Sequence, residues 1–121
     1  MHARSVRTAL LGLTLLTLAA LPVAAQERIS TRAAFLDRVA GQELSRLGIS
    51  VRATPGGAIA GRALGQDVTG MWDWSGSFFC RTLSWGSRSW ARDCQAVQVD
   101  GDRVYFIGDK GRGQSVWLTL N

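Results

Sequence analysis

The side chains best suited to chemistry in this sequence are two cysteines, several aspartates and a short run of tryptophan and arginine. Cys80 and Cys94 are its only cysteines, and His2 is its only histidine. Imidazole is the side chain that changes charge near neutrality, so its absence from the rest of the chain removes the usual general base. A serine or cysteine nucleophile activated by histidine is therefore not expected.

The first 25 residues are typical of a signal peptide. A basic start is followed by the apolar run 9–21, and the small residues 23–25 form a cleavage pattern. The apolar run is shorter than the about 20 residues that cross a bilayer, and no cysteine lies near the cleavage site for lipid attachment. We expect a protein that is exported to the periplasm or secreted, with no transmembrane segment and without His2.

Export favours a disulfide between Cys80 and Cys94, because proteins of oxidising compartments keep paired cysteines bridged. The bridge would close a loop with 13 residues between the two cysteines. Two thiolates without a histidine lack the usual partners of a zinc site. The sequence therefore predicts no metal and no cofactor.

The charge balance argues against a nucleic-acid partner. The chain holds 14 Lys and Arg against 9 Asp and Glu, and loss of Arg4 and Arg7 with the signal peptide lowers the net charge from +5 to +3. A nucleic-acid-binding domain normally carries a dense basic patch. Eleven of the 12 remaining basic residues are arginine, and the planar arginine fork suits carboxylate or phosphate groups. Anionic polymers of the cell envelope stay open as ligands.

Four aspartates could serve an enzyme, namely Asp67, Asp73, Asp93 and Asp109. A pair of carboxylates held about 5 to 10 Å apart can act as acid and base. The alternative is that these residues serve turns and solubility, since aspartate beside glycine is common in turns. We expect no enzyme and keep a small carboxylate-dependent hydrolase as an alternative.

The run from Ser84 to Asp93 has the composition of a binding loop, with the disulfide at its base. Two tryptophans and two arginines alternate there with small residues. Tryptophan faces stack on sugars or bases, and arginine pairs with anions. The run predicts a ligand site made of Trp85, Arg88, Trp90 and Arg92. The competing interpretation is that Trp85 and Trp90 fill the core.

A single domain must position these residues, because 121 residues with 46% hydrophobic and 19% charged content suit one folded unit. Residues 26–48 are predicted as a helical segment, with a helix over 31–40 that Ser30 or Thr31 caps and an uncertain continuation through 41–47. Residues 49–121 are predicted as an antiparallel β domain. About seven strands are expected, at 49–54, 58–63, 68–74, 77–83, 94–99, 103–107 and 115–120.

Glycine-containing turns separate these strands, and the Asp100-Gly101 pair is the best hairpin indication. Because a flat meander would expose its edges, we expect the sheet to curl into a small barrel or coiled sheet, with the helix over one open end. Alternation places one set of side chains on the inner face: Val68, Gly70, Trp72, Trp74, Phe78, Cys80, Val104, Phe106, Val116, Leu118 and Leu120.

The order of motifs resembles a group of small secreted bacterial proteins. The pattern G-x-W-x-W-x-G-x-x-F-C-R lies at 70–81, D-C-Q-x-V at 93–97, G-D-x-x-x-F at 101–106 and D-x-G-x-G at 109–113. Members are sometimes labelled dihydrodipicolinate reductase. That reductase resembles a two-domain nucleotide-binding enzyme with a glycine fingerprint and a His-rich motif, and this chain has neither. The resemblance implies a shared fold and export, and no activity.

A second likeness is to periplasmic inhibitors of lysozyme, which are small disulfide-bearing β-barrels with an S-G-x-x-Y motif. Ser75, Gly76 and Phe79 match this motif except that phenylalanine replaces tyrosine and its hydroxyl. The likeness implies an inhibitor-like loop as an alternative function. The main expectation is an exported binding or envelope-associated module that contacts glycan, another anionic envelope ligand or a periplasmic protein.

Overall fold

A computed structural model describes residue 3, residues 11–17 and residues 26–121 of the chain. The expected signal peptide lies mostly outside these described residues, and the structure does not test it. The described part forms nine strands and two short helices. Their bounds are β1 Glu27–Ile29, α1 Arg32–Arg38, β2 Leu44–Arg46, β3 Ile49–Ala53, β4 Ala58–Ala63, β5 Gln66–Ser75, β6 Phe78–Trp85, β7 Arg88–Asp100, β8 Arg103–Ile107, α2 Gly108–Gly111 and β9 Ser115–Leu120.

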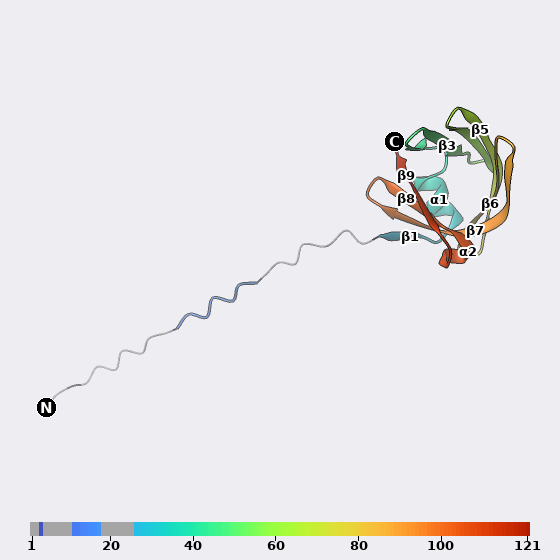
Figure 1. Cartoon of the computed structure of the whole chain (residues 1–121). Helices are drawn as coiled ribbons and strands as arrows, with labels where there is room; N and C mark the ends of the chain where they lie inside the picture. The colour runs from blue at the N-terminus through green and yellow to red at the C-terminus, as the bar shows by residue number, and fades with distance from the viewer. Residues whose placement is uncertain (1–2, 4–10, 18–25) are drawn as a thin grey trace.

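The strands close into an antiparallel barrel, which confirms the predicted fold class (Figure 1). Strands β2 to β8 each pair with the next strand of the chain, and β2 pairs with β9 to complete the ring. Glycines at two positions allow the strands to coil tightly, because a Cβ on Gly61 or Gly70 would collide with the neighbouring backbone. Strand β1 adds to the edge of β7 beyond the end of β6.

The N-terminal segment differs from the expected helical segment 26–48. Thr31 caps α1 by accepting a hydrogen bond from the backbone N–H of Ala34 at 3.1 Å, as predicted, but the helix ends at Arg38. Gly41 then adopts a φ of +78° and donates its N–H to the carbonyl oxygen of Ala53. This turn directs Leu44 into the barrel wall as the start of β2. Two three-residue strands, β1 and β2, are too short to show alternation, so the prediction found seven strands instead of nine.

Helix α1 closes one end of the barrel, as expected (Figure 1). Its Phe35 is fully buried and lies 5.1 Å from Trp72, 5.5 Å from Trp74 and 4.9 Å from Phe79 between ring centroids. This aromatic cluster fills the helix end of the lumen. The other end of the lumen is not covered by α1.

The run 84–93 is not a loop, so that prediction was wrong. Strand β6 continues to Trp85 and β7 begins at Arg88, which leaves Gly86 and Ser87 as a two-residue turn. Gly86 has a φ of +55°, the left-handed conformation that such a turn needs. Beyond the turn, β7 shifts register near Thr82 of β6 and continues to pair with β8. The outer face of this hairpin carries small and polar residues, so the sequence pattern predicts a loop and not two strands.

The inner faces of β5, β8 and β9 are as predicted, but the inner face of β6 is the opposite one. Phe79 is 3% exposed and lies inside. Cys80 pairs with Asp73, which points away from the lumen, so Phe78 and Cys80 belong to the outer face. Arginine in the inner row, at Arg81, breaks the apolar alternation and explains the error.

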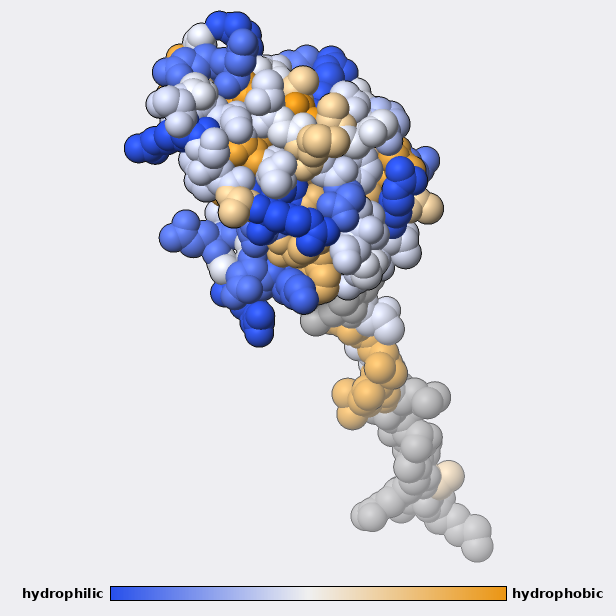
Figure 2. All heavy atoms as spheres, turned by 90° about the vertical axis from the view of Figure 1, so that its right-hand side faces the viewer, coloured by the Kyte–Doolittle hydropathy of each residue, from blue (hydrophilic) through white to orange (hydrophobic). Residues whose placement is uncertain are grey.

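The outer wall carries the predicted disulfide between Cys80 and Cys94. These residues face one another across β6 and β7. Hydrophilic side chains cover much of the side of the barrel in Figure 2, with hydrophobic ones scattered among them. Within the described ranges, neither helix is long and apolar enough to cross a membrane.

Candidate functional site

The candidate site is a cavity of about 290 Å³ inside the barrel, at the end away from α1. It lies above the aromatic cluster, with Phe79 at the junction of the two. Its walls come from all eight barrel strands, β2 to β9. The apolar lining residues are Leu44, Ile49, Val51, Ala53, Ile59, Ala63, Val68, Phe79, Leu83, Trp85, Trp90, Phe106, Val116 and Leu118.

A space of this size is unusual in a packed protein. Protein interiors leave few voids larger than a water molecule. The cavity has roughly twice the ~150 Å³ of an engineered apolar cavity that stays dry and binds benzene. Its apolar wall offers water few partners, so a ligand of matching shape would gain van der Waals contacts with the lining side chains.

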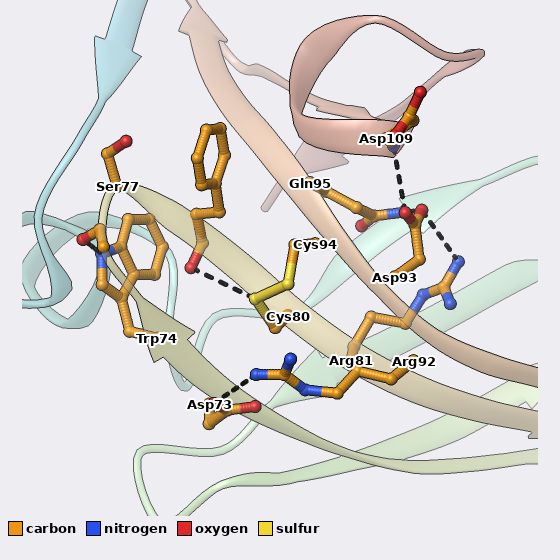
Figure 3. The surroundings of a disulfide bond; sticks show 12 residues. Asp73, Trp74, Ser77, Cys80, Arg81, Arg92, Asp93, Cys94, Gln95 and Asp109 are labelled. Atoms are coloured by element: carbon orange, nitrogen blue, oxygen red, sulfur yellow. Dashed lines mark hydrogen bonds and ion pairs between the residues drawn. A yellow bond between two sulfur atoms is a disulfide. The ribbon is translucent and has the colours of Figure 1, made fainter.

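One wall of the cavity is polar, where β6 and β7 meet (Figure 3). Arg81 and Gln95 line the cavity, and Asp93 lies beside both. The Arg81 guanidinium is 4.0 Å from the Asp93 carboxylate and donates to the carbonyl oxygen of Ala91 at 3.3 Å. The other wall, from β2 to β4, contributes only aliphatic side chains apart from Arg52. The cavity is therefore amphipathic.

Asp93 is held mainly by two other donors. Its carboxylate accepts the backbone N–H of Asp109 at 3.0 Å and the Gln95 side-chain amide at 3.2 Å (Figure 3). The Asp109 N–H is available because α2 is a tight turn in which Asp109 has a φ of +48°. Arg81 is thus the most distant partner of Asp93.

Of the four predicted ligand residues, two reach the cavity. Trp85 lines it near the mouth and donates its indole N–H to the carbonyl oxygen of Ala63 at 2.8 Å. Trp90 also lines it and keeps 40% of its surface exposed. Trp85 packs against the core, and both Trp85 and Trp90 line the open cavity.

The two arginines lie elsewhere. Arg88 pairs with Trp85 across the hairpin and is exposed beside Ser87 and Gln66. Arg92 pairs with the Asp73 carboxylate at 2.8 Å on the outer wall (Figure 3). Arg88 therefore adjoins Trp85 at the hairpin, whereas Arg92 lies apart on the outer wall.

The alternative sites gain little from the structure. Ser75 ends β5 and Gly76 forms the following turn, but Phe79 is packed in the aromatic cluster and is not accessible to the cleft of another protein. The four aspartates bind four different arginines: Asp67 with Arg62, Asp73 with Arg92, Asp93 with Arg81 and Asp109 with Arg112. Asp93 and Asp109 meet through a backbone N–H.

Metal chemistry also finds no support in the described part of the chain. Within residues 3, 11–17 and 26–121, no group of three or more His, Cys, Asp or Glu side chains could hold a metal ion. Both cysteines are bonded to each other in the disulfide.

The charged cavity residue that the sequence did not single out is Arg81. It was noted only as part of a motif, although it stands in the row Phe79, Arg81, Leu83 and Trp85 that alternates along β6. A charged residue within an otherwise apolar alternating row is the sequence feature that could have indicated Arg81.

No protein-family model, curated protein or solved structure matches the chain.

Proposed function

We propose that this protein is an exported binding protein that takes a small, largely apolar molecule into the barrel cavity. The observation that carries the proposal is the open apolar space of about 290 Å³ in a barrel whose other end is tightly packed. Eight-stranded barrels either fill their interior with side chains or hold one small ligand. The tight packing around Phe35 shows that this sequence can fill a lumen, yet the mouth end is left open.

The proposal favours an apolar ligand over a glycan. A sugar would place hydroxyl groups against aliphatic walls that cannot accept or donate hydrogen bonds, and each unpaired group costs free energy. Trp85 and Trp90, which the sequence predicts as sugar-stacking platforms, instead extend the apolar wall toward the mouth. Contact with envelope glycan through Trp85, Arg88, Trp90 and Arg92 stays a prediction that the same binding experiment can test.

Export agrees with the disulfide, since bridged cysteines persist in oxidising compartments. A cavity protein in that compartment would carry or capture a molecule that is poorly soluble in water. The gain comes from removal of apolar ligand surface from water, at about 25 cal/mol per Å².

The test is a calorimetric titration of the protein, without its first 25 residues, with 1-octanol. One binding site and a rise in Tm are expected. Ligand at about 100 times its Kd adds about 2.7 kcal/mol of stability, which corresponds to roughly 10 °C or more for a domain of this size.

A matched pair of variants on β4 locates the ligand. Ala63→Phe adds a ring to the cavity wall, whereas Ala60→Phe adds the same ring to the exposed face of the same strand. We expect Ala63→Phe to weaken octanol binding about tenfold or more and Ala60→Phe to leave it unchanged. Absence of octanol binding, or equal binding by both variants, would reject the cavity as the site. Tighter binding of soluble peptidoglycan fragments than of octanol would favour the glycan prediction instead.

A further inference from the structure

Arg81 is a nearly buried cation with few partners. Its side chain is 15% exposed and lines the cavity. A guanidinium has five N–H donors, and among the described residues this group donates one hydrogen bond, at 3.3 Å to the carbonyl oxygen of Ala91. The Asp93 carboxylate lies 4.0 Å away, at the outer limit of an ion pair. Burying a charge without close partners is costly, so the position favours an additional partner.

The hydrogen bonds of Asp93 do not depend on Arg81, so Arg81 can bind a further partner. Both Asp93 oxygens already accept hydrogen bonds, from the Asp109 backbone and from Gln95. An anion that approaches Arg81 from the lumen would not have to replace these donors. The fork of Arg81 matches a planar carboxylate, which it can bind through two parallel hydrogen bonds.

We infer that the ligand is an amphipathic acid, whose apolar part fills the cavity and whose carboxylate binds Arg81. This inference rests on the proposed function and names the class of its ligand. Arg81 pairs with Trp72 on β5 and with Asp93 on β7, so it lies between the aromatic cluster and the mouth. The aliphatic wall from β2 to β4 faces it across the lumen and receives the rest of the molecule.

The test compares three ligands with the same eight-carbon chain: octanoate, 1-octanol and octylamine. Calorimetry at neutral pH is expected to rank octanoate first, 1-octanol second and octylamine last. A hydrogen bond to a charged group contributes about 1.5–3 kcal/mol, so octanoate should bind roughly tenfold or more tightly than 1-octanol.

Two arginine variants assign the preference to a residue. Arg81→Met keeps an apolar chain of similar length and should make octanoate bind no better than 1-octanol. Arg92→Met makes the same change at the arginine that pairs with Asp73 on the outer wall, and should keep the preference. Circular dichroism and Tm measurements confirm that both variants are folded.

A measurement on the unmodified protein covers the case in which Arg81→Met does not fold. The carbon-13 signal of [1-13C]octanoate reports the ionisation of the bound acid, whose pKa should lie below that of free octanoic acid because the guanidinium stabilises the carboxylate. A bound pKa equal to or above the free value would overturn the inference.

The outcomes separate the two proposals. If none of the three ligands binds, the proposed function fails. If octanol and octanoate bind equally, or octylamine binds best, the cavity is a ligand site but Arg81 does not select an acid. If Arg92→Met loses the preference as Arg81→Met does, the effect comes from overall charge and the inference is again overturned.

Discussion

Reduction of the Cys80–Cys94 disulfide should destabilise the barrel without removing its cavity. The bridge links residues 14 apart in sequence. Closing a loop of about 15 residues stabilises the fold by about 3 kcal/mol, mainly by restricting the unfolded chain. The bridge lies on the outer face of β6 and β7, whereas the cavity is lined by the inner face. Reduction therefore acts on the unfolded state and leaves the lining residues in place.

Urea denaturation followed by tryptophan fluorescence measures this loss. With a typical slope of ~1–2 kcal/mol per M of urea for a small domain, the midpoint should fall by roughly 1.5–3 M when a reductant is added. The Cys80→Ala/Cys94→Ala variant is the control, because its midpoint should match the reduced protein and should not respond to the reductant. Calorimetric titration of the reduced protein below its unfolding temperature should give an octanol Kd within about twofold of the oxidised value.

Two results would refute this reasoning. An unchanged midpoint after reduction would show that the bridge adds nothing to the constraints already present in the unfolded chain. Loss of octanol binding by reduced but folded protein would show that the inner faces of β6 and β7 depend on the outer bridge.

Two further substitutions test the packing and the turns. Phe35→Ala should lower the free energy of unfolding by about 3–5 kcal/mol, because the buried ring of Phe35 touches Trp72, Trp74 and Phe79. The control Asp37→Ala, on the exposed side of α1, should change the free energy of unfolding by less than about 0.5 kcal/mol in a parallel urea titration. Equal effects of the two substitutions would show that α1 does not close the barrel. Leu64→Asn should raise the free energy of unfolding by about 1 kcal/mol. Leu64 is 69% exposed and has a φ of +50°, which asparagine tolerates better than leucine. A decrease in the urea midpoint of this variant would contradict the explanation.

The strand positions that were predicted well share a local cause. Strands β4, β8 and β9 have the predicted bounds, and each follows a glycine-containing turn that only a few backbone conformations satisfy. The bridge between Cys80 and Cys94 likewise follows from composition, because two cysteines can pair within one chain in only one way. These features need no knowledge of distant residues.

The candidate site could not be predicted in the same way. The outer row of β6 contains Phe78, Cys80 and Thr82, and the inner row contains Phe79, Arg81 and Leu83, so both rows mix apolar and polar side chains. Polarity alone therefore cannot identify the inner row. Pairing of Arg81 with Trp72, whose ring packs against Phe35, decides it.

The sequence by itself determined an antiparallel β fold, its main turns, a capped N-terminal helix and a bridge between two cysteines, because each depends on the conformations of neighbouring residues or on the cysteine count. Only the tertiary structure decided that β2 and β9 close the ring and that a cavity remains at one end. Leu44 and Leu120 meet across that closure although 75 intervening residues separate them in the chain. The space inside a barrel depends on how all of its walls approach one another, and no local pattern contains that information.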